Sequence, residues 1–104
     1  MKRYEVRWAS LDPVVGTAKT RPVVIVSLDT LNDRLGTVVI CPLTSQLHPG
    51  WRARVAVRVA GRDAEIAVDQ IRTVSKARVG AKVGRLSDAT ASELRRLITE
   101  MYGE

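Results

Sequence analysis

The stretch Lys19-Thr20-Arg21-Pro22-Val23-Val24-Ile25-Val26-Ser27 joins a basic segment to a short, β-branched apolar run. An unbroken run of Val and Ile of this length predicts a buried strand over residues 22–27. Proline sets the backbone where this strand begins, so Arg21 is expected at the edge of a rigid element, where functional groups are held best. The stretch therefore predicts a β-rich core with a functional cation beside it.

Polar side chains also mark two further apolar strands. Cys41-Pro42-Leu43-Thr44-Ser45-Gln46 closes a strand predicted over residues 37–43. Ala67-Val68-Asp69-Gln70-Ile71-Arg72 lies within a strand predicted over residues 65–74, with a kink near Asp69. Guanidinium, hydroxyl and carboxamide groups are the groups that bind a phosphodiester. We therefore expect these strand ends to handle a phosphate-containing ligand.

The remaining pattern predicts a small mainly β domain. Further strands are expected over residues 4–11, 52–59 and 81–86, with a hairpin turn at residues 60–63. Val6 and Trp8 would share one face of the first strand, and Arg52, Arg54 and Arg58 the outer face of the strand over 52–59. These short strands, a short internal helix over residues 29–35 and a C-terminal helix predict a strongly curved β-barrel.

The C-terminal helix has clear signals. Ser87 is a good N-cap, and Asp88 follows in the first turn. An apolar stripe at helical spacing then predicts a buried or interface face, formed by Leu94, Leu97, Ile98 and Met101.

Size and charge narrow the possible functions. The 104 residues fit one domain, and 17 Lys and Arg against 11 Asp and Glu give a net charge of +6. This charge favours an anionic partner such as nucleic acid, although an acidic protein, a membrane surface or merely a basic surface are alternatives. One Cys within an apolar strand and one His cannot form a closed zinc site, so we expect no metal and no cofactor. Without a signal peptide or membrane-spanning run, the expected location is the cytoplasm.

Several motifs occur together in a specific order, and the ordered set resembles one family. The motifs are Leu11-Asp12-Pro13, Gly16, the stretch from Lys19 to Ser27, Pro42-Leu43-Thr44-Ser45, Asp69-Gln70-Ile71-Arg72-Thr73 and Gly84-Arg85-Leu86-Ser87. With these motifs the chain resembles the MazF/PemK toxins of bacterial toxin–antitoxin pairs over almost its whole length. The resemblance implies an SH3-like barrel, a homodimer, a MazE-like acidic antitoxin, and ribosome-independent cleavage of single-stranded mRNA at short sequences.

The resemblance also implies catalytic residues. Arg21 matches the family's catalytic arginine, Thr44 and Ser45 its catalytic threonine and neighbour, and the next motif supplies Asp69, Gln70 and Arg72. In metal-independent cleavage the 2′-hydroxyl attacks, giving a 2′,3′-cyclic phosphate and a 5′-hydroxyl end. Arg21 would stabilise the added charge, Thr44 and Ser45 would donate to phosphoryl oxygens, and Asp69 would act as base or orient Arg72.

Simpler interpretations stay open for these residues. Arg21 could be an ordinary surface arginine, Thr44 and Ser45 could serve only the turn, and Asp69 could form a structural ion pair with Arg72. The chain also departs from the family pattern, because Thr17-Ala18-Lys19-Thr20 lacks the carboxylate proposed as a base in some relatives.

RNA contacts are expected from Lys19, Thr20, Gln46, His48, Trp51 and Gln70. Trp51 could stack an unpaired base, and Gln70 could read a base edge. Alternatively, His48 is a solvent-exposed loop residue and Trp51 packs under the loop or binds the antitoxin. Arg52, Arg54 and Arg58 would form a phosphate track or keep their face soluble. Two other functions remain possible: a non-catalytic toxin like the gyrase poison CcdB, and a basic RNA-binding module.

Overall fold

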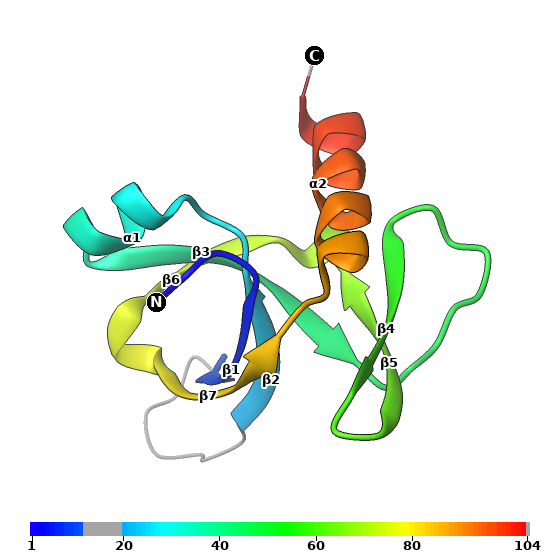
Figure 1. Ribbon diagram of the computed structural model, residues 1–104, viewed down its shortest axis with the longest axis horizontal. Coiled ribbons are helices and arrows are strands. Elements are labelled where there is room, and N and C mark those ends of the chain that lie inside the picture. The colour runs from blue at the N-terminus through cyan, green and yellow to red at the C-terminus, as the bar shows by residue number, and fades with distance from the viewer. Residues whose placement is uncertain (12–19, 104) are drawn as a thin grey trace.

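The computed structural model describes residues 1–11 and 20–103, which form a mainly β fold with two α-helices (Figure 1). The strands are β1 (Glu5–Ser10), β2 (Thr20–Ile25), β3 (Thr37–Thr44), β4 (Arg54–Val59), β5 (Arg62–Ala67), β6 (Arg72–Ser75) and β7 (Val79–Arg85). The helices are α1 (Asp29–Arg34) and α2 (Asp88–Tyr102), and two 3-10 helices, η1 (Val68–Gln70) and η2 (Lys76–Arg78), flank β6. The predicted fold class is confirmed, with short internal and C-terminal helices both present.

The described strands form one antiparallel sheet in which β3 is central. Along the sheet the order is β4-β5-β3-β2-β1-β7, and β6 also pairs with β3. On one edge of β3, Cys41 lies opposite Val24 of β2; on the other edge, Val38 lies opposite Val74 of β6 and Leu43 opposite Ile66 of β5. β5 and β6 pair with different parts of the same edge of β3 and run in different directions, so the sheet is strongly curved (Figure 1).

The unbroken apolar run of β2 is explained by burial on both faces of the sheet. Val24 belongs to a core cluster with Val6, Cys41 and Leu94, whereas Val23 and Ile25 pack in a second cluster on the other face. All three β2 residues are fully buried. A strand covered on both faces needs apolar side chains at every position, so no alternation is seen in the sequence.

Local signals set the turns and the start of α2. Ala60 and Gly61 have φ values of 51° and 77° and join Val59 to Arg62, which is the two-residue hairpin turn that fits the strand twist. The turn is therefore shorter than the predicted 60–63, because residues 62 and 63 already pair in β5. The Ser87 hydroxyl accepts a hydrogen bond from the Thr90 N–H at 3.2 Å, which confirms the predicted N-cap.

The strand predicted over residues 65–74 is two strands separated by η1, so the kink near Asp69 is a 3-10 turn. Leu94 of α2 is fully buried in the core, while Met101 at the end of the same stripe is 36% exposed. None of the helices in the described residues is long and apolar enough to cross a membrane.

Candidate functional site

An open groove of about 910 Å³ crosses the start of β2, the end of β3 and the β4–β5 hairpin. The start of β2 meets the end of β3 because the two strands are antiparallel, with Val23 opposite Pro42. This register brings Arg21 and Thr44 to the same end of the strand pair. Ser45 and Gln46, which follow β3, line the same groove, so four of the predicted site residues lie together.

Arg21 and Thr44 present different groups to the groove. Arg21 is exposed, and among the described residues its guanidinium makes no hydrogen bond or ion pair. Thr44 Oγ1 accepts a hydrogen bond from the Gln46 N–H at 3.1 Å, so the hydroxyl does serve the turn. This bond uses a lone pair of the oxygen and leaves the O–H proton available for another acceptor.

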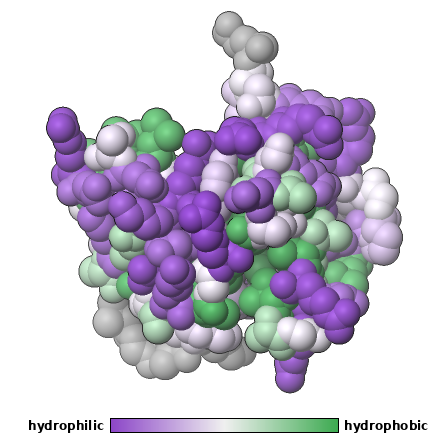
Figure 2. Space-filling model, viewed as in Figure 1, coloured by the Kyte–Doolittle hydropathy of each residue, from purple (hydrophilic) through white to green (hydrophobic). Residues whose placement is uncertain are grey.

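The groove is lined by both apolar and polar residues. Val59 and Val83 line both this groove and a neighbouring hollow of about 460 Å³. Figure 2 shows hydrophobic residues gathered in the depression between β2 and the β4–β5 hairpin, with hydrophilic side chains around it. Such a surface suits a ligand that has flat apolar parts and charged parts.

Trp8 is a groove residue that the sequence analysis missed. The pattern places it on one face of the strand with Val6 and does not say how exposed either is; Val6 is 3% exposed, whereas Trp8 is 43% exposed and lines the groove. Trp8 lies opposite Pro22, at the end of β1 that reaches the site. The register between β1 and β2 would have revealed this position, but alternation within one strand does not.

The exposure expected of the outer face of β4 is wrong for Arg54. Its side chain is only 7% exposed, whereas the exposed fractions for Arg52 and Arg58 are 88% and 72%. Arg54 Nε lies 3.0 Å from Asp69 Oδ1, and Nη1 lies 3.5 Å from Glu65 Oε1. Two carboxylates from β5 and η1 therefore pair with this arginine and bury its side chain, and the three arginines do not form one exposed track.

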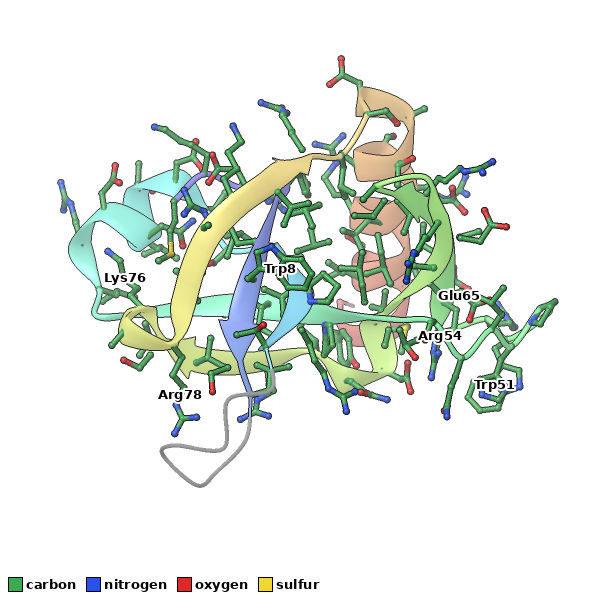
Figure 3. The ribbon with its side chains drawn as sticks, turned by 90° about the horizontal axis from the view of Figure 1, so that it is seen from below. Trp8, Trp51, Arg54, Glu65, Lys76 and Arg78 are labelled. Carbon is green, nitrogen blue, oxygen red and sulfur yellow. The ribbon has the colours of Figure 1, made fainter. Side chains whose placement is uncertain are left out.

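The loop between β3 and β4 is attached to this ion-paired cluster. His48 and Trp51 stack with their rings 3.8 Å apart and nearly parallel, and the Arg54 guanidinium lies 5.1 Å from the centre of the Trp51 ring. The His48 N–H donates to Glu65 Oε1 at 2.9 Å. These residues line a separate pocket of about 420 Å³, and Figure 3 shows Trp51 well away from Trp8.

The other predicted site residues lie outside the groove lining. Asp69 and Gln70 belong to η1, and Arg72 begins β6 opposite Ile40. In the described part of the chain Asp69 pairs with Arg54 and makes no ion pair with Arg72. Thr20 is exposed at the first position of β2, and Lys19 lies outside the described residues.

Cys41 is a core residue and not a reactive group. It is fully buried on β3, and burial together with the negative charge of Asp69 raises the pKa of its thiol to about 12. Within residues 1–11 and 20–103, the His, Cys, Asp and Glu side chains form no group that could hold a metal ion.

Comparisons with known proteins agree with this fold. Residues 2–102 match the family model of PemK-like, MazF-like toxins of type II toxin–antitoxin systems. The chain is 32% identical to the Endoribonuclease MazF of Staphylococcus saprophyticus, over 99% of this chain and 92% of that protein. A mycobacterial endoribonuclease solved with its cognate antitoxin has a TM-score of 0.83 at 22% identity, covering 99% of this chain and 95% of that one. A MazE–MazF structure from Deinococcus radiodurans has a TM-score of 0.83 at 19% identity, with the same coverage.

The family match over residues 2–102 thus places this curved sheet in the class of toxins of type II toxin–antitoxin systems. The chain belongs to the PemK/MazF family of such toxins, which confirms the resemblance found from the motifs. The name of the curated relative supports the prediction of an endoribonuclease.

Proposed function

We propose that this toxin is a sequence-specific endoribonuclease that cuts single-stranded mRNA without the ribosome and without a metal ion. The observation that carries the proposal is the meeting of Arg21, Thr44, Ser45 and Gln46 in one groove. A cation beside hydroxyl and carboxamide donors is what a phosphodiester needs when negative charge builds on its oxygens.

In the proposed reaction the 2′-oxygen attacks the adjacent phosphorus while the bond from phosphorus to the 5′-oxygen breaks. The 2′-hydroxyl loses its proton to a base, and the leaving 5′-oxygen takes up a proton, so the products are a 2′,3′-cyclic phosphate and a 5′-hydroxyl end. Arg21 binds two phosphoryl oxygens and stabilises their added charge. Thr44 and Ser45 donate hydrogen bonds to the same group.

For the base that takes the 2′-proton, the structure offers a candidate other than Asp69. Asp69 is engaged by Arg54 away from the groove, whereas Asp63 is the carboxylate among the described residues that line it. We assign the acceptor role to Asp63 and a positioning role to Asp69. Gln70 and Arg72, both exposed, would contact the strand beyond the scissile phosphate, as would Lys19, Thr20, His48 and Trp51.

The partners follow from the same proposal. Solved relatives of this fold include complexes described as MazE–MazF and as an endoribonuclease with its cognate antitoxin. We propose a MazE-like acidic antitoxin for this chain, which its net charge of +6 would attract. We also propose that the protein is a homodimer that acts in the cytoplasm. Sedimentation equilibrium of the purified toxin tests whether its mass is that of a dimer.

The deciding experiment is incubation of antitoxin-free protein with a long single-stranded RNA in excess EDTA, followed by analysis of the fragment ends. Discrete cuts with 2′,3′-cyclic phosphates support the proposal and reveal the sequence preference. Cleavage that EDTA abolishes contradicts the metal-independent mechanism. Intact RNA with a folded protein favours the alternatives, which are a non-catalytic toxin like CcdB or an RNA-binding module.

A further inference from the structure

We propose that Trp8 forms a stacking site for the nucleobase next to the scissile phosphate. The inference rests on the proposed function and adds a base-binding position to the groove. Its first support is the exposure of the indole, of which 43% faces solvent although the residue lies in a strand of the central sheet. An exposed flat indole that lines a groove is suited to stacking on another planar ring.

The strand register places this indole beside the phosphate-binding groups. Trp8 lies opposite Pro22, the residue that follows Arg21 in β2, at the end of the strand pair where Arg21 lies. Trp8 and Arg21 both line the groove at this end. One nucleotide can therefore place its phosphate at Arg21 and its base at Trp8.

The surroundings favour a nucleobase over a purely apolar ligand. Pro22, Val59 and Val83 give the groove apolar surface near Trp8, while Arg21 and Arg62 line its polar part. A nucleotide satisfies both kinds of surface, since its base is planar and its phosphate anionic. The overall charge of +6 attracts the same class of ligand.

Trp51 provides a matched comparison within the same chain. It is 52% exposed, but one face of its indole is already covered by His48, and it lies in a different pocket. Trp51 therefore does not share the nucleotide position that Arg21 and Trp8 define. The two tryptophans should respond differently when a single base is removed from the RNA.

The test uses the full chain and a single strand of about 15 nucleotides that carries a cleavage site mapped with the wild-type protein. All its 2′-hydroxyls are methylated to block attack, and two further strands lack the base on one side or the other of the scissile phosphate. Binding is measured for the wild type, Trp8→Leu, Trp8→Phe and Trp51→Leu. We expect Trp8→Leu to bind the intact strand about tenfold more weakly than the wild type does. With one of the two abasic strands, the difference in affinity between Trp8→Leu and the wild type should largely disappear.

The other variants complete the cycle. Trp8→Phe keeps an aromatic face and should restore most of the affinity, whereas the effect of Trp51→Leu should be equal on intact and abasic strands. An equal loss for Trp8→Leu on every strand overturns the stacking site. The stacking site is also overturned if Trp8→Leu loses affinity and the mass of the RNA-free variant differs from that of the wild type, because Trp8 would then belong to a contact between copies.

A fluorescence titration keeps the proposal testable where Trp8→Leu does not fold. In Trp51→Phe all tryptophan emission comes from Trp8, and the intact strand should quench it more than the matching abasic strand does. Unchanged emission with the intact strand overturns the site. A wild-type protein that cleaves no RNA instead refutes the proposed function, so the two failures are distinguishable.

Discussion

Arg54 Nε lies 3.0 Å from Asp69 Oδ1. This ion pair connects β4, whose arginines the sequence pattern places on its outer face, with the 3-10 turn η1. Glu65 completes the cluster from β5 and also accepts the His48 N–H, so one buried arginine connects three segments. Figure 3 shows Arg54 and Glu65 beside the loop that carries Trp51. A group in this position is expected to affect both stability and the placement of the loop.

Arg54→Met should lower the free energy of unfolding by about 3 kcal/mol, because it leaves the Glu65 carboxylate buried without its partner. Arg58→Met is the matched control on the same strand, and its exposed pair with Asp63 at 3.9 Å should contribute less than about 1 kcal/mol. Urea denaturation measures both values. Equal effects of the two substitutions would show that the Arg54 cluster contributes no special stability.

Arg21→Ala should reduce kcat for RNA cleavage by about 10²–10³-fold, since it removes the cation that stabilises the charged phosphorus centre. Affinity for a 2′-O-methylated strand should fall much less. Arg95→Ala, an exposed position on α2, controls for the loss of one positive charge. Cleavage that continues at the wild-type rate in Arg21→Ala would exclude the proposed role.

Thr44→Val should lose about 100-fold in kcat, because the methyl group can neither donate to the phosphate nor accept from the Gln46 N–H. Thr44→Ser keeps the hydroxyl and should stay within about fivefold of the wild type. Single-turnover cleavage separates this effect from binding. Equal activity of the two variants would assign Thr44 to the turn alone.

Acid stability should depend on Glu5. Burial by itself would raise the pKa of this carboxyl, but hydrogen bonds from the Lys2 N–H and the side chains of Arg7 and Lys82 lower it to about 2, from an ordinary value of 4.5. A lowered pKa means that the ionised Glu5 stabilises the fold above about pH 4.5, and this contribution is lost as the pH falls toward about 2. The stability difference between wild type and Glu5→Gln should therefore shrink over that range in urea titrations. A difference that does not change with pH would contradict the lowered pKa.

Cys41 should be inert in the folded protein. Its buried thiol, with a pKa of about 12, should not react with a disulfide reagent at pH 8, while the same protein in urea should react at once. Absorbance at the wavelength of the released thiolate follows both reactions. Rapid labelling without urea would show that β3 opens readily near Thr44.

Elements governed by local signals were predicted well. The Ser87 cap, the Ala60-Gly61 turn and the apolar β2 run are present because each depends on residues close together in the chain. The gathering of Arg21 with Thr44 was also predicted, but from the family motifs and not from spacing alone. The catalytic roles of these residues stay predictions until cleavage is measured.

Two positions could not be inferred from alternation. Arg54 alternates along the strand in step with Arg52 and Arg58, yet its side chain is buried because Glu65 and Asp69 pair with it from other elements. Trp8 lies two residues after Val6 and so shares its face of β1, yet it reaches the open groove because β1 extends to the end of the sheet where β2 begins. In both cases the residues that decide the exposure of the side chain come from other elements of the fold.

By itself, the sequence determined where most strands lie, the presence of a hairpin turn after Val59, the helix cap at Ser87 and the family, because propensity, patterning and ordered motifs are properties of the chain. Only the tertiary structure decided which side chains share a groove and which arginine is buried. Those outcomes depend on strand order and register, where a shift of one residue would move every side chain to the opposite face.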